Sequence, residues 1–337
     1  MRPEEKHCAI LVDEMQLTAG LDFDPTVKNP IGLATAPLSN PVPKGELTYA
    51  THGLVLMLTG LSSRWKQVVA YHLTGDSNDG SFLRDFLFSV IEKCEAAGCH
   101  VDAVISDMGP NNKALCHRVR GQSFFLPAAI VTKYELPTDE VSVKHIRELA
   151  VIDAERDLKL ASHLKPAHLD PDHFAKMNVA SSVAVLNHSV GAATRTLVSL
   201  RLLESEALTT AWFVERVFRW FTLMTSRYIG TAMSLFKHDE AVAFLKEFME
   251  IFAHVCIKSG NAKEMFKPVQ AGVLITASSA LHIQHQLLSV PKFKFVLLCR
   301  LSQDALENLF CIRSRHPVPR PLEFKLMLRL IMLSQFF

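Results

Sequence analysis

Three acidic side chains occupy positions from which they could hold divalent cations. Asp13 ends the apolar run of residues 9–12, and Asp107 ends the run of residues 101–106. Glu307 lies in an amphipathic stretch, residues 301–310. A two-metal phosphoryl-transfer site needs such acids, because hard cations bind carboxylate oxygens that converge from rigid elements. A plainer interpretation is that each acid is an ordinary turn residue, as single acids after strands commonly are.

The elements expected around the two aspartates are those of an α/β domain. Four apolar runs predict buried strands, at residues 7–12, 53–59, 67–73 and 101–106. Residues 79–97 have helical spacing closed by Gly98, and residues 111–120 are also expected to be helical. This is the element order of the ribonuclease-H-like fold, in which the first and fourth strands are neighbours. Asp13 and Asp107 would therefore project side by side.

The middle of the sequence changes to a helical pattern. Apolar residues recur at i, i+3 and i+4 in five segments, residues 141–158, 172–186, 209–227, 240–258 and 269–288. The expected fold class is α/β, a ribonuclease-H-like mixed sheet interrupted by a large all-α insertion domain, and the interruption is what the family resemblance of residues 10–15, 105–112 and 301–310 implies. The expected domains are residues 1–140 for the first part of the catalytic domain, 141–290 for the insertion, and 291–337 for the return with Glu307.

Composition narrows the functional classes. The 337 residues are 49% hydrophobic, which is ample for a sizeable core, and the net charge of +2 gives no global basic field for nucleic acid. The seven cysteines include no CxxC pair, so neither a zinc finger nor a disulfide framework is indicated. The first residues have no apolar core of a signal peptide, and no uncharged apolar stretch is long enough to span a membrane.

Four stretches, in order, resemble the central region of P-element-type transposases, the family that includes the THAP-domain transposases. They are residues 10–15 with 20–24, residues 50–55 with 60–67, residues 105–112, and residues 301–310 with 312–313. The resemblance implies Mg²⁺- or Mn²⁺-dependent DNA cleavage and strand transfer by a ribonuclease-H-like domain. It makes Asp13 the bridging acid, Asp107 the second metal ligand and Glu307 the third.

The resemblance also implies a nucleotide, a partner and a location. The helical insertion of the family binds GTP, and the matching positions here are Val179, Phe221 and Asp304. Thr222 stands where the family tends to have an aspartate, the residue type that accepts both guanine donors, so this pocket is altered. The implied partners are DNA transposon ends and further copies of the chain, with no membrane, and the implied location is the nucleus.

Departures from the family pattern keep a second function open. Residues 1–337 show neither the zinc-coordinating DNA-binding module expected at the N-terminus of the family nor the Asp-x-x-His-Leu-x-Lys stretch expected after the second aspartate. The sheet is therefore expected to be short of a strand. The alternative is a non-enzymatic, transposon-derived protein that keeps the fold for DNA or protein interaction. Retention of all three acids favours the enzyme, and loss of the guanine-reading aspartate favours the alternative.

Overall fold

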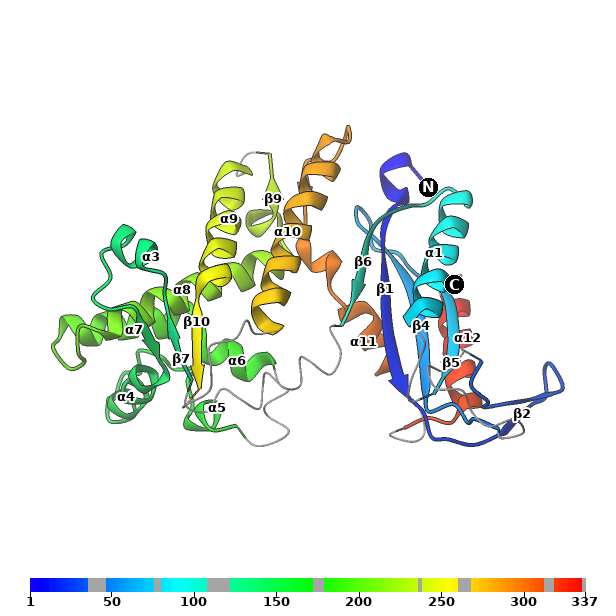
Figure 1. The fold of residues 1–337 in the computed structure, drawn as a ribbon, viewed down its shortest axis with the longest axis horizontal. Helices are drawn as coiled ribbons and strands as arrows, with labels where there is room; N and C mark the ends of the chain where they lie inside the picture. Colours follow the sequence, from blue (N-terminus) through cyan, green and yellow to red (C-terminus); the bar gives the residue numbers. More distant parts are fainter. Residues whose placement is uncertain are drawn as a thin grey trace. The chain divides into compact units, whose positions relative to one another are not determined.

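The computed structural model describes residues 1–35, 47–75, 80–107, 122–171, 179–235, 238–259, 268–311 and 318–334. Contacts divide the chain into two compact units, Met1–Asp107 with Leu287–Phe337, and Met108–Gln286 (Figure 1). The expected domains over residues 1–140, 141–290 and 291–337 stay a prediction, since compact units are defined by contacts alone. The helix expected over residues 111–120 lies outside the described residues.

A four-stranded mixed sheet forms the centre of the first unit. Its strand order is β5-β4-β1-β6, so the first strand lies between the second long strand and the strand that follows the first helix. The four strands are β1 (His7–Gln16), β4 (His52–Gly60), β5 (Lys66–Thr74) and β6 (His100–Ser106). Each of the four expected strands is present, and the first and fourth are neighbours, as predicted. Within the described part of this sheet, β6 is the edge strand.

Strand direction and register align the two aspartates. β1 pairs antiparallel with β4 and parallel with β6. The parallel register places Leu11 beside Ile105 and Val12 beside Ser106, after a shift between Cys8 and Ala9. β6 therefore ends beside Val12, while β1 continues to Gln16, and the residue that follows each of the partners Val12 and Ser106 is an aspartate. This register makes Asp13 and Asp107 neighbours.

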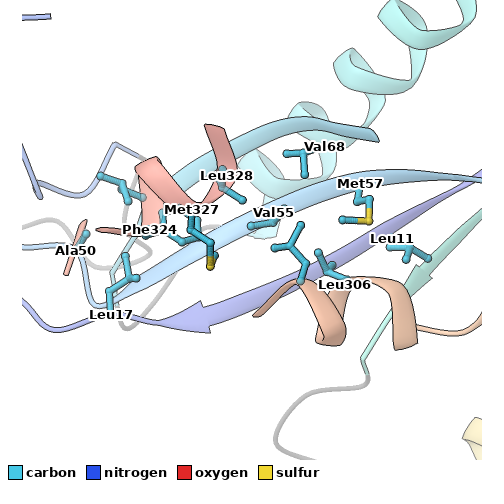
Figure 2. Packing of buried hydrophobic residues seen from close by; sticks show 12 residues of the cluster. Leu11, Leu17, Ala50, Val55, Met57, Val68, Leu306, Phe324, Met327 and Leu328 are labelled. Atoms are coloured by element: carbon cyan, nitrogen blue, oxygen red, sulfur yellow. The ribbon is translucent and has the colours of Figure 1, made fainter. Parts of the chain in front are cut away.

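Helices cover both faces of this sheet because its strands are apolar on both sides. On one face, α1 (Gly80–Ala96) places Val90 and Cys94 against Cys8, Ile10 and Val12 of β1. On the other, α11 (Asp304–Phe310) and α12 (Pro321–Ser334) pack against Leu11, Val55 and Met57. Figure 2 shows Leu306 of α11 and Phe324, Met327 and Leu328 of α12 on this second face. Alternate residues of β1 thus point to different helices.

A charged cluster connects α12 to a small hairpin that follows β1. The hairpin is formed by β2 (Asp22–Asp24) and β3 (Asn29–Ile31). Asp24 is 1% exposed and accepts a hydrogen bond from Lys325 Nζ at 2.5 Å. This bond is the main reason why the pKa of Asp24 is lowered to about 2. Asp22 pairs with Arg320 at 2.8 Å. The remaining short elements of this unit are the 3₁₀ turns Pro3–Lys6 and Leu298–Leu301 and the strand β11 (Phe295–Val296).

The second unit is mostly helical and also contains a three-stranded sheet that the helical pattern did not predict. The sheet order is β10-β7-β8, with both neighbouring pairs antiparallel. Its strands are β7 (Gln122–Phe125), β8 (Glu140–Ser142) and β10 (Cys256–Ser259). The helix predicted over residues 240–258 was wrong at its end, since α9 (His238–His254) stops before β10 pairs with β7.

The helices of this unit pack around aliphatic and aromatic side chains. Ile146, Leu149, Val190, Leu197 and Val214 form one core cluster. Besides α9, the unit contains the short strand β9 (Met233–Ser234), a 3₁₀ turn (Ile229–Thr231) and the helices α3 (Ala128–Lys133), α4 (Val143–Ala154), α5 (Pro166–Leu169), α6 (Val179–Val185), α7 (His188–Ser199), α8 (Ala207–Met224) and most of α10 (Pro268–Ser289). No helix among the described residues is long and apolar enough to cross a membrane.

Candidate active site at the carboxyl ends of β1 and β6

Asp13 lies near the end of β1, directly after five fully buried residues. Leu11 and Met15, its neighbours two residues away, pack in the cluster under α11 and α12. Because side chains alternate along a strand, Asp13 belongs to the same face. Its Oδ1 accepts a hydrogen bond from the backbone N–H of Glu14 at 2.8 Å.

Asp107 directly follows the last residue of β6. Ser106 is the parallel partner of Val12, so Asp107 comes next to Asp13 in the register of the two strands. Ile105 packs in the same cluster as Leu11, which puts the alternating positions 105 and 107 on the α11 face. Asp107 is exposed to solvent. The structure therefore brings the two predicted aspartates together.

Glu307 is carried by α11, which the apolar core holds against the same face. Leu306 is 0% exposed and Leu309 is 3% exposed, and both pack in the cluster that contains Leu11. Glu307 is exposed on the helix surface between them. The charge of Asp13 contributes to a raised pKa of Glu307, in keeping with the packing of α11 against Leu11 of β1.

Mutual repulsion is the electrostatic signature of this site. Burial raises the pKa of Asp13, the hydrogen bond from Glu14 opposes this, and the charge of Asp107 raises it further. Loss of surrounding water raises the pKa of Glu307, and the charges of Asp304, Asp13 and Asp107 add to that increase. Both pKa values rise chiefly because burial removes water from the charged carboxylates, and the neighbouring negative charges add to this rise. A divalent cation would remove that cost.

The donor chemistry of these acids fits Mg²⁺ or Mn²⁺ shared between carboxylates. Within the described residues, no group of three or more His, Cys, Asp or Glu side chains is arranged to hold one ion. Mg²⁺, however, keeps several waters and is commonly held by one or two carboxylates together with substrate phosphates. Asp13, Asp107 and Glu307 offer carboxylate oxygens of this kind on one face of the sheet.

Other acids near the site have different neighbours. Glu14, which would point to the opposite face of β1, is exposed, and its Oε1 accepts a hydrogen bond from Thr74 at 3.4 Å. Asp102 lies at the other end of β6, with its carboxylate 3.0 Å from Nδ1 of His7. Asp304 stands one helical turn before Glu307 and contributes to its raised pKa, an electrostatic role that the sequence interpretation did not assign. The three-residue spacing of Asp304 and Glu307 on a helix was the available signal.

Sequence reasoning also missed Gln303. Its Nε2 donates a hydrogen bond to the backbone carbonyl of Val12 at 3.2 Å, so α11 and the strand of Asp13 are joined by a polar contact as well as by the core. A glutamine in an amphipathic stretch has no distinctive pattern, because 291 residues separate the two partners. Only the folded chain reveals the contact.

The three residues expected to contact GTP lie on three helices. Val179 begins α6 and is 62% exposed, while Phe221 lies in α8 and is partly buried. Both belong to the second unit. Asp304 begins α11 in the first unit. The Phe221 carbonyl accepts a bond from Thr225 Oγ1 at 2.7 Å, an ordinary helix-end contact. GTP binding by these residues stays a prediction.

Three comparisons relate the chain to proteins already described. Residues 1–120 match the family described as TNP-like, RNase H N-terminal domain. The chain is 21% identical over 360 residues to the Transposable element P transposase of Drosophila melanogaster, an alignment that covers 96% of this chain and 45% of that protein. The chain therefore spans less than half the length of this curated relative.

A solved structure has the same fold over almost the whole chain. The likeness is to a chain titled Drosophila P element transposase strand transfer complex, with a TM-score of 0.77 and 19% identity. It covers 99% of this chain and 78% of that one. Together with the family match, it confirms the expected fold class, a mixed α/β arrangement of the ribonuclease-H-like kind.

Proposed function

We propose that this homologue of the P-element transposase, whose first 120 residues carry a TNP-like RNase H N-terminal domain, is the core of a DNA transposase that cleaves and joins phosphodiesters with divalent cations. The observation that carries the proposal is the register of β1 and β6, which makes Asp13 and Asp107 neighbours, together with the packing of α11, which carries Glu307, on the same face of the sheet. The expected location is the nucleus, and the expected partners are DNA ends and further copies of the chain.

In this proposal each acid has a separate task. Asp13, held by the central strand, would be shared between two cation positions, while Asp107 and Glu307 would each complete one of them. Two bound ions would activate the attacking oxygen and stabilise the leaving oxygen of an in-line displacement. The sheet carries Asp13 and Asp107, and the buried Leu306 and Leu309 hold α11 on the sheet, which reduces the reorganisation required when substrate arrives.

Cation binding and plasmid cleavage test the proposal together. We expect the purified chain to bind Mn²⁺ by calorimetry and to nick supercoiled plasmid DNA in Mn²⁺. The Asp107→Asn variant is expected to lose both properties while unfolding at the same temperature or higher. If wild type and Asp107→Asn bind Mn²⁺ equally and neither cleaves DNA, the proposal is wrong. The non-enzymatic function, with the fold kept for DNA or protein interaction, would then be favoured.

GTP is a separate part of the proposal, since none of its three expected contacts, Val179, Phe221 and Asp304, is an expected metal ligand. The test is fluorescence titration with a labelled GTP analogue, with ATP as the competitor. Preferential displacement by GTP over ATP, together with loss of binding in Phe221→Ala, would support nucleotide binding by the insertion. Equal displacement by both nucleotides would indicate that Thr222 has removed guanine selection.

A further inference from the structure

Gln303 joins the start of α11 to β1 through its side chain. It is the residue before α11, where a side chain usually caps its own helix, but its side chain makes no such cap. The amide instead reaches the Val12 carbonyl, with Nε2 3.2 Å from the oxygen. A carbonyl oxygen has two lone pairs, so Val12 can accept this bond in addition to a strand contact.

The backbone of Gln303 supports the third acid directly. Its carbonyl oxygen accepts hydrogen bonds from the backbone N–H of Leu306 at 2.8 Å and of Glu307 at 3.0 Å. A continuous path therefore runs from the Glu307 N–H to Gln303, and from the Gln303 amide to the peptide that joins Val12 to Asp13. Two acids that repel each other are attached to the two ends of this path.

The apolar contacts of α11 do not by themselves fix its position along the strands, and the hydrogen bond from Gln303 does. Leu306 and Leu309 hold the helix onto the sheet, but apolar packing is non-directional and permits small slides along the strands. The negative charges of Asp13 and Asp107 oppose ionisation of Glu307, so the charged acids favour a larger distance between α11 and β1. A directional hydrogen bond at the start of the helix opposes it.

We propose that Gln303 is a positioning residue that sets the separation between Glu307 and Asp13. The effect on cation binding rests on the proposed function. The hydrogen bond from Gln303 to the Val12 carbonyl, here called the tether, is present in the metal-free chain. Gln303→Met removes the amide and keeps the length and volume of the side chain. Asn308→Leu is the matched control, because Asn308 lies exposed on the same helix and the same chemical change occurs there.

Hydrogen exchange of the metal-free protein is the first measurement. Loss of one hydrogen bond predicts roughly three- to tenfold faster exchange of the Leu306 and Glu307 amides in Gln303→Met. We expect no change at these amides in Asn308→Leu. Equal exchange rates in the wild type and in Gln303→Met would overturn the proposal, whatever the metal does.

Mn²⁺ affinity is the second measurement. If Gln303 only stabilised the fold, Gln303→Met would lower the melting temperature and would not weaken Mn²⁺ binding on its own. We expect Gln303→Met to raise the Mn²⁺ dissociation constant by about tenfold or more, as residues that orient ligands typically do, while its melting temperature stays within a few degrees of the wild type. An unchanged dissociation constant with faster exchange would also contradict positioning. If exchange accelerates but the wild type binds no Mn²⁺, the tether stands and the proposed function fails.

Discussion

Val12 and Ser106 are partners in the parallel pairing of β1 with β6, and the next residue of each chain segment is an aspartate. This register, together with the packing of Leu11 and Ile105 under α11, gives Asp13 and Asp107 a common sheet face. The apolar strands therefore do more than form a core. They place two negative charges together, and the cost of that arrangement has measurable consequences.

The first prediction concerns the charge of Asp13 in the absence of cations. Its folded-state pKa is raised above the ordinary 3.8, so the folded protein binds the proton more tightly than the unfolded chain. The stability that Asp13 contributes is complete below pH 3.8 and is lost as pH rises through the higher folded pKa. At pH 7, Asp13→Asn should therefore raise the melting temperature in EDTA. A fall of several degrees would contradict the repulsion account.

The second prediction compares Mn²⁺ binding after loss of the charge of Glu307 on α11 and of Glu14 on β1. Glu307→Gln should weaken Mn²⁺ binding by about 100-fold or more, because even residues that only orient ligands contribute roughly 10- to 100-fold. Glu14→Gln is the control, since Glu14 accepts its bond from Thr74 and lies at the adjacent strand position. Calorimetric titration of both variants checks this. Equal losses would mean that bulk negative charge, and not a defined site, attracts the cation.

The third prediction tests the core that supports Glu307. Leu306→Ala should lower the free energy of unfolding by about 2–5 kcal/mol, because Leu306 is 0% exposed and its loss leaves a cavity against β1. Asn308→Ala, on the exposed side of the same helix, should change it by less than about 0.5 kcal/mol. Urea denaturation measures both. Similar effects of the two substitutions would show that α11 is not packed on the sheet.

The fourth prediction concerns close packing between β4 and α12. A Cβ at Gly53 would lie 2.6 Å from Cζ of Phe324, whose side chain is 0% exposed. Gly53→Ala should therefore destabilise the fold by about 1–3 kcal/mol through overpacking. Gly230→Ala is the control, because nothing lies within 4 Å of its added Cβ. Thermal unfolding that ranks Gly230→Ala as the more harmful change would refute this contact.

The fifth prediction follows from the ion pair of Asp24 and Lys325. The pKa of Asp24 is lowered from 3.8 to about 2, so its contribution is present above pH 3.8 and is lost as pH falls through 2. Lys325→Met should remove this dependence, and its melting temperature should fall most, relative to the wild type, near neutral pH. Melting curves between pH 2 and pH 7 test the sign. A difference that grows on acidification would contradict it.

The sequence predicted the strands of the first unit because they are apolar runs, although β1 continues beyond the predicted residues 7–12 to Gln16. Asp13 and Asp107 could be paired from strand order alone, since the first and fourth strands are parallel neighbours. The strand β10 could not be predicted, because Cys256 continues a helical pattern and becomes a strand only by pairing with Phe125. Gln303 was missed for a similar reason, as its partner Val12 is remote in the sequence.

The most direct test of the central claim is anomalous diffraction from crystals of the chain soaked in Mn²⁺. The account predicts anomalous density between the carboxylates of Asp13, Asp107 and Glu307, with no such density in crystals of Asp107→Asn soaked in the same way. Density located elsewhere, or crystals that take up no Mn²⁺ at these acids at millimolar concentration, would contradict a cation site on this face of the sheet.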